Sequence, residues 1–202
     1  MRKTTAVILI TLASLFIVSC SLFSKAPVKH YYQIYYSPKE GTARTIPATV
    51  RIKSFEEDKI YRRHNLVYRK SFEEMFYYNT HFWASRPADM LTDIVANHLA
   101  KKNMFSEVIV AMDKRPKYVI TGRLTALDEI ISGEKRYARV GITFELRDYD
   151  TNTVIVAHSF EERKEVAGME PVYVVRAMGE IIDSQIEQFI EKIYASIPEE
   201  ED

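Results

Sequence analysis

Four residues near the start of the chain, Ile17, Val18, Ser19 and Cys20, have the types and order that lipid attachment needs. The thiol of Cys20 can accept a diacylglycerol group, and the small Ser19 before it suits a peptidase that frees the cysteine amine for N-acylation. Cys20 is also the only cysteine, so no intramolecular disulfide can use it. We therefore expect residues 17–20 to be a lipobox, with diacylglycerol and N-acyl lipid on Cys20 and no other cofactor.

The residues before the lipobox have the three parts of an export signal. Arg2 and Lys3 form a short basic region, and a mostly apolar run follows over residues 6–18. A membrane-spanning helix needs ~20 apolar residues, so this run is too short to be one. We expect a signal peptide over residues 1–19 and a mature chain at the periplasmic face of the cell envelope. Ser21, in a place where aspartate favours the inner membrane, favours the outer membrane.

The rest of the sequence has none of the patterns that common catalytic or cofactor sites require. No two histidines have a His-x-x-x-His spacing and there is no second cysteine, so we expect no metal site. No nucleophile elbow, phosphate loop or dinucleotide fingerprint occurs. Adjacent carboxylates such as Glu161 and Glu162 would point to opposite faces of a strand, which excludes an acid–base pair. We expect no enzymatic activity, and we expect His98 to be packed and hydrogen-bonded rather than a ligand.

The charge of the chain is balanced, with 28 Lys and Arg against 28 Asp and Glu. Binding to nucleic acid needs a basic excess that neutralises phosphates, so we expect no nucleic-acid partner. Aromatic residues are plentiful, with 13 Tyr and 10 Phe, as in a sheet-rich domain or a partner-binding surface.

Residues 76–83 are the most unusual stretch, because they hold five aromatic residues and the only tryptophan. One interpretation is a core strand whose aromatic side chains cover the first helix. The other is a binding surface for a protein partner or a lipid, since Tyr and Trp bury a large area and keep a polar tip. The candidate partner-binding residues are Tyr77, Tyr78, Phe82, Trp83 and Arg86.

Hydrophobic periodicity divides the chain into helices and strands. Apolar residues at steps of three and four predict one helix from Pro87 to about residue 102 and a longer helix from Pro171. Alternation and aromatic runs predict strands at residues 30–36, 49–55, 66–68, 75–78, 105–110, 118–131, 137–149 and 154–163. The polar segment 56–65 is predicted to be a loop.

These elements predict an α+β fold in a single domain over residues 30–197. The last three strands follow one another closely, so they predict a mostly antiparallel sheet built as a meander. We expect the two amphipathic helices to pack on one face of this sheet and the other face to be partly solvated. Residues 20–29 would then be the lipidated cysteine and a tether, and residues 198–202 an acidic tail.

Several short motifs occur in the order in which one known family has them. They are Tyr31-Tyr32-Gln33-Ile34, Val50-Arg51-Ile52, Trp83-Ala84-Ser85-Arg86-Pro87, Tyr118-Val119-Ile120-Thr121-Gly122-Arg123-Leu124, Phe144-Glu145-Leu146-Arg147-Asp148 and Val175-Arg176-Ala177-Met178-Gly179. With Cys20, they make the chain resemble the ABC-type transport auxiliary lipoproteins, the PqiC-like family, over nearly the whole mature chain. The sequence departs from the family pattern at Asn152-Thr153, where members often have Thr-Gly.

The resemblance implies a non-enzymatic accessory subunit. Such lipoproteins accompany an ATPase, a permease and a periplasmic protein of the mammalian-cell-entry (MCE) type, which move phospholipids or other hydrophobic molecules between the two membranes. The implied partners are the MCE-domain protein, the membrane through the lipid anchor, and further copies of the chain in a ring. The alternative is a structural envelope lipoprotein, or an assembly factor of another secretion or outer-membrane complex.

Overall fold

The computed structural model describes residues 26–35, 41, 44–197 and 199, and within them the chain forms one nine-stranded mixed sheet, one 3-10 turn and two helices. The signal peptide, the lipobox and most of the acidic tail lie outside the described residues. The strands are β1 (His30–Tyr32), β2 (Ile46–Ile52), β3 (Glu56–Glu57), β4 (Asn65–Arg69), β5 (Met75–Trp83), β6 (Phe105–Ile109), β7 (Tyr118–Ser132), β8 (Lys135–Asp148) and β9 (Val154–Val166). The 3-10 turn is Lys59–Tyr61, and the helices are α2 (Pro87–Lys101) and α3 (Pro171–Ser196).

Strand β7 organises the sheet, because each of its edges is used differently. One edge pairs with β8 in antiparallel register along its whole length, from Tyr118 opposite Asp148 to Ser132 opposite Lys135. The other edge takes three short parallel strands in turn: β2 at residues 118–120, β3 at residues 123–124 and β4 at residues 128–130. Outside these, β6 pairs with β2, and β5 and then β1 extend the sheet beyond β4.

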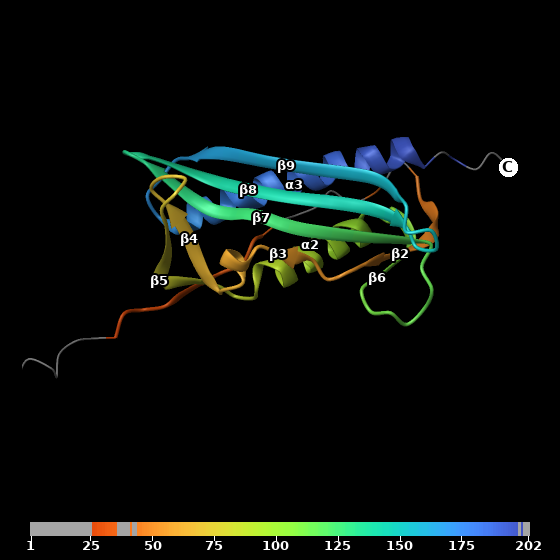
Figure 1. Ribbon diagram of the computed structural model, residues 1–202, viewed down its shortest axis with the longest axis horizontal. Helices are drawn as coiled ribbons and strands as arrows, with labels where there is room; N and C mark the ends of the chain where they lie inside the picture. The colour runs from red at the N-terminus through yellow and green to blue at the C-terminus, as the bar shows by residue number, and fades with distance from the viewer. Residues whose placement is uncertain (1–25, 36–40, 42–43, 198, 200–202) are drawn as a thin grey trace, which may run out of the picture.

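The meander of β7, β8 and β9 has the alternation that the sequence predicts. Along β8, every second side chain is buried in the core, as at Val140, Ile142 and Phe144. Side chains between them, such as Thr143 and Glu145, lie on the opposite and partly solvated face. Figure 1 shows these three strands running side by side along the length of the molecule, with α3 behind them.

Both helices pack on the buried face of the sheet, as predicted. The ring of Phe189 on α3 stacks on Phe144 of β8, with their centroids 5.3 Å apart. On α2, Thr92 Oγ1 accepts the backbone N–H of Phe55 at 3.0 Å, and the Phe55 ring packs against Phe144 on the same face. The two helices meet through a hydrogen bond of 2.8 Å between His98 and Glu187.

At Gly122 on β7, the segment that follows β2 crosses close over the sheet. A side chain at this position would begin 2.3 Å from the Phe55 ring, so only glycine leaves room for that ring to lie against the strand. Phe55 in turn connects β2 to β3 and holds the start of α2 near the sheet.

The α+β fold class, the single domain, the meander and the two helices on one face are confirmed. Two expectations are wrong in detail. The segment 56–65 is not a plain loop, because Glu56 and Glu57 pair with β7 and the 3-10 turn follows. The aromatic strand is also longer than predicted, because β5 continues from Met75 to Trp83. The sheet is mixed, since β7 takes its short neighbours in parallel. No helix of the described residues is both long and apolar enough to cross a membrane.

Candidate interaction site on the β4–β5 hairpin

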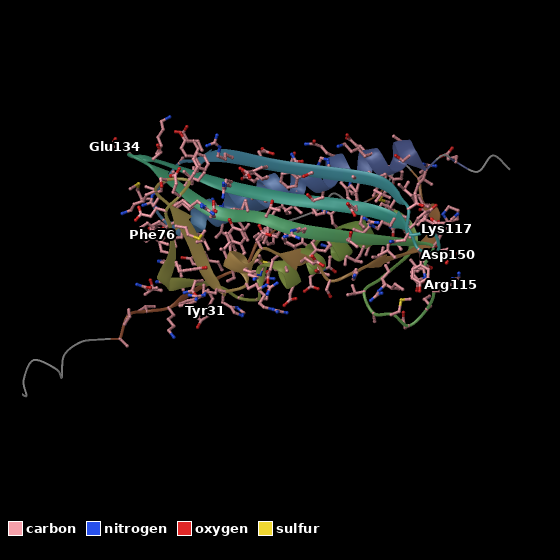
Figure 2. The ribbon with its side chains drawn as sticks, viewed as in Figure 1. Tyr31, Phe76, Arg115, Lys117, Glu134 and Asp150 are labelled. Atoms are coloured by element: carbon pink, nitrogen blue, oxygen red, sulfur yellow. The ribbon has the colours of Figure 1, made fainter. Side chains whose placement is uncertain are left out.

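The aromatic stretch of the sequence lies in an antiparallel hairpin formed by β4, a turn at residues 70–74, and β5. The pairing is irregular: Asn65 lies opposite Phe82 but Val67 lies opposite Tyr77, so β5 bulges between them. The hairpin sits at one end of the molecule, where β4 joins the last residues of β7. Figure 2 shows Tyr31, Phe76 and Glu134 at this end, and Arg115, Lys117 and Asp150 at the other.

A buried carboxylate on β7 holds the hairpin from one face of the sheet. Asp128 is fully buried and accepts hydrogen bonds from Arg139 at 2.9 Å, Arg69 at 2.8 Å and the Tyr61 hydroxyl at 2.7 Å. Burial, reinforced by the negative charge of Asp128, raises the pKa of Tyr61 to about 12. Tyr61 therefore remains a neutral donor, and the carboxylate is satisfied by two cations from β4 and β8.

The next residue of β7 holds the hairpin from the other face. Glu129 is buried, accepts a 2.6 Å hydrogen bond from the Tyr78 hydroxyl and forms an ion pair with Arg136. Burial, with the added effect of Glu129, raises the pKa of Tyr78 well above its ordinary value. Because Asp128 and Glu129 point to opposite faces, β4 and β5 are clamped to β7 on both sides.

Four half-buried rings and the exposed ring of His30 form a continuous row across β4, β5 and β1. Tyr68 lies between Phe76, at 5.0 Å, and Tyr78, at 4.7 Å between ring centroids. His81 continues the row at 5.1 Å from Tyr78 and 5.1 Å from His30. Burial, and then the proximity of His30, lowers the pKa of His81. We call Tyr68, Phe76, Tyr78, His81 and His30 the aromatic row.

The structure divides the residues that the sequence nominated for partner binding. Trp83 is only 2% exposed, so it is a core residue and the first of the two interpretations applies to it. Tyr78 belongs to the aromatic row. The other three residues lie outside the row: Tyr77 and Phe82 on β5, and Arg86 beside Glu56, Asp58 and Arg123 nearer the middle of β7.

Each of these three is held by a local contact. The Tyr77 hydroxyl donates to the Ile60 carbonyl at 3.1 Å, and the Arg63 guanidinium lies 4.7 Å from its ring centre. Phe82 is half-buried beside Tyr31 of β1, with 5.7 Å between their ring centroids. Arg86 is an exposed residue just before α2 and forms an ion pair of 2.9 Å with Asp89.

Sequence reasoning missed most of the aromatic row. Tyr68 and His30 lie on other strands, and their contact with β5 depends on pairing between distant segments. Phe76 and His81 are within the aromatic stretch, but the bulge in β5 decides which of its rings share a face. The only signal in the sequence was the density of aromatic residues in residues 76–83.

The remaining residues singled out in the sequence are His98, the possible metal ligands and the lipobox. His98 is buried and hydrogen-bonded to Glu187, as predicted. Among the described residues, no three His, Cys, Asp or Glu side chains gather as metal ligands would. The lipobox residues, Ile17, Val18, Ser19 and Cys20, lie outside the described part of the chain.

Comparison with known proteins places this fold among related structures. A family model described as the ABC-type transport auxiliary lipoprotein component matches residues 32–189. The crystal structure of protein XCC0632 from Xanthomonas campestris has a TM-score of 0.74 at 14% identity, covering 82% of this chain and 95% of that one. A crystal structure of an uncharacterized protein has a TM-score of 0.66 at 12% identity, covering 83% and 99%. At these identities the two structures share the fold alone, and no curated protein matches the chain.

Proposed function

Because the chain belongs to the family of ABC-type transport auxiliary lipoproteins, we propose that it is a non-enzymatic accessory subunit of an MCE-type lipid transport system. In this proposal Cys20 carries the lipid anchor and residues 21–29 give the folded domain its reach. The domain faces the periplasm from the outer membrane and contacts the MCE-domain protein, so that the system bridges the two membranes. The transported molecules are phospholipids or other hydrophobic compounds.

The observation that carries the proposal is the family match over residues 32–189, which spans the last residue of β1, all of β2 to β9 and most of α3. The aromatic row supplies a fitting contact surface. Four of its rings are only half-buried and the ring of His30 is exposed, although full burial of an aromatic ring would stabilise the protein more. The clamps at Asp128 and Glu129 hold these rings in place, so a partner would find the surface already ordered.

Purification of the lipidated protein from native membranes tests the proposed partner. We expect an MCE-domain protein to co-purify with it. The variant Phe76→Ala should reduce this recovery by roughly tenfold or more, because a truncated aromatic anchor typically costs an interface at least ~1–2 kcal/mol. Met112→Ala, an exposed position at the opposite end, is the matched control and should leave recovery unchanged.

Unchanged melting temperatures of both variants would show that the fold is intact. If the unaltered protein repeatedly recovered only unrelated envelope proteins, the MCE role would be wrong. If an MCE-domain protein were recovered equally well with Phe76→Ala, the role would stand and the aromatic row would not be the contact.

A further inference from the structure

A groove of about 620 Å³ opens at the hairpin end, on the face of the sheet opposite to α3. Its walls are the β4–β5 turn and the adjoining ends of β7, β8 and β9. Apolar surface comes from Phe72, Ile131 and Tyr137, and charge comes chiefly from Lys70 and Arg163. The groove is thus an open, amphipathic cavity on the other side of the hairpin from the aromatic row. Lys70 lies between the two, because its Nζ is 5.4 Å from the ring centre of Phe76.

The charge in the groove is positive and lacks counterions. Neither Lys70 nor Arg163 has an ion pair with any described residue, whereas the lining acid Glu165 is paired with Lys135 at 3.1 Å. Arg163 also lies directly opposite Arg139 in the β8–β9 pairing, and Arg139 is already neutralised by Asp128. An anion in the groove would therefore meet two cations, Lys70 and Arg163, that pair with no described carboxylate, whereas Arg139 is already held by Asp128 and Glu161.

Phe72 stands at the rim of this groove and is held there. Its side chain is 64% exposed. Arg69, which is fixed by Asp128, donates to the Phe72 carbonyl at 2.9 Å, and Ser71 accepts the backbone N–H of Glu74 at 3.1 Å. The turn is therefore ordered by its own hydrogen bonds and presents a large apolar ring to the solvent. With Ile131 and Tyr137, this ring gives the groove its apolar side.

The course of the N-terminal residues indicates that the groove lies near the membrane. The first described residues, 26–29, lead into β1 at this same end of the molecule (Figure 1). Ten residues, Cys20 to Lys29, precede His30, and an extended chain of that length spans at most about 35 Å. A lipid on Cys20 would thus keep the hairpin end close to the headgroups of the bilayer that holds it.

We propose that this groove binds the phosphate headgroup of an anionic phospholipid in the anchoring membrane. Lys70 and Arg163 contact the phosphate, and Phe72 enters the region between the headgroups and the acyl chains. The contact orients the domain on its membrane and is separate from the contact with the transport partner. It rests on the acylation of Cys20 proposed above, because the tether brings the groove to the bilayer.

A single reporter cysteine can test this contact in the intact lipidated protein. Cys20 is the only natural cysteine, and acylation removes its thiol, so a dye would react only with the new residue. Glu73→Cys places the dye beside the groove, and Met112→Cys places it in the exposed loop at the far end. Both proteins are put into phosphatidylcholine vesicles with or without phosphatidylglycerol and with a quencher attached to the headgroups.

We expect strong quenching for Glu73→Cys in vesicles with phosphatidylglycerol, and little for Met112→Cys. Adding Lys70→Glu and Arg163→Glu should lower the ratio of docked to undocked protein by roughly tenfold or more, since each cation near an anionic surface contributes appreciably. Lys101→Glu, which reverses an exposed charge near the end of α2, is the matched control and should change nothing.

Three results would overturn the proposal. One is equal quenching at both positions, and another is quenching that the two reversals at Lys70 and Arg163 do not change. A third is equal quenching with and without phosphatidylglycerol. The mass of the intact protein is measured in parallel: if it showed no lipid and the protein left the vesicles, the anchor itself would be refuted, and the docking with it.

Discussion

Asp128 and Glu129 are neighbours on β7 and point to opposite faces of the sheet. Asp128 binds two arginines and a tyrosine, and Glu129 binds one arginine and a tyrosine. Buried carboxylates of this kind are costly unless every oxygen has a partner. Here the partners come from β4, β5, β8 and the 3-10 turn, so the cost of burial is offset only when the hairpin is docked. The two residues therefore specify where the hairpin sits.

Asp128→Ala should destabilise the protein strongly. It would leave the buried charge of Arg139 and the half-buried Arg69 without their carboxylate, which typically costs about 3–5 kcal/mol. Urea unfolding measures the change. Asp150→Ala, which removes an exposed ion pair with Arg115, is the control and should cost under about 1 kcal/mol. A similar small loss for both variants would mean that the Asp128 cluster does not hold the hairpin.

Trp83→Ala should lower the melting temperature by several degrees or more. The side chain is buried, and removing a large aromatic group from a core typically costs about 3–5 kcal/mol. Tyr31→Ala, at an exposed position of β1, serves as the control and should leave the melting temperature nearly unchanged. A weakened partner contact without any loss of thermal stability would instead assign Trp83 to an interface.

At the scale of elements, α3 packs against two buried histidines, His98 of α2 and His158 of β9. His158 of β9 accepts a hydrogen bond from Lys192 at 2.7 Å and is bonded to Gln185 at 2.7 Å, and Gln185 also reaches Glu162. His98 of α2 lies against Glu187 and Asp183 of α3, with Lys102 nearby. Burial lowers the pKa of both histidines, and at His158 the charge of Lys192 lowers it further.

Mild acid should therefore destabilise the protein. The ordinary histidine pKa is 6.5, so below about that pH the unfolded chain takes up protons that the folded protein does not. The free energy of unfolding has its largest value above this pH. It falls as the pH drops towards the lower pKa values that His98 and His158 have in the folded protein. Urea unfolding at pH 7.5 and 5.5 checks the sign of the change.

The variant His158→Gln separates this effect from general acid sensitivity. It removes one of the three histidines whose pKa is lowered in the folded protein, His81, His98 and His158, so the difference in stability between pH 7.5 and 5.5 should shrink. His64→Gln, at an exposed histidine, should leave the difference as it was. A protein that was equally stable at both pH values would contradict the conclusion that α3 packs against buried histidines with lowered pKa values.

Several elements could be predicted because their signals are local. The strict alternation along β8 and the steps of three and four along α3 each depend only on neighbouring residues. The order of β2, β3 and β4 along β7 could not be predicted, since it depends on parallel pairing between distant segments. Glu56 and Glu57 show the difficulty most clearly: two charged residues form a strand because β7 offers them a free edge.

At the scale of the whole molecule, the sequence indicated the family and the aromatic stretch but not the arrangement of the surfaces. The hairpin end carries the aromatic row on one side and the cationic groove on the other, and β1 brings the start of the chain to the same end. Lys70 and Arg163, far apart in sequence, line one groove because β4 and β9 both end there. Such a site could not be read from motifs.

The most direct test of the account is the mass and location of the mature protein. Lipidated protein purified from membranes should be heavier than the polypeptide starting at Cys20 by a diacylglycerol group and one acyl chain, and should fractionate with the outer membrane. The Cys20→Ser variant should carry no lipid and be lost from that fraction. If variant and parent showed no lipid mass difference and fractionated alike, the anchor and the transport role built on it would both be contradicted.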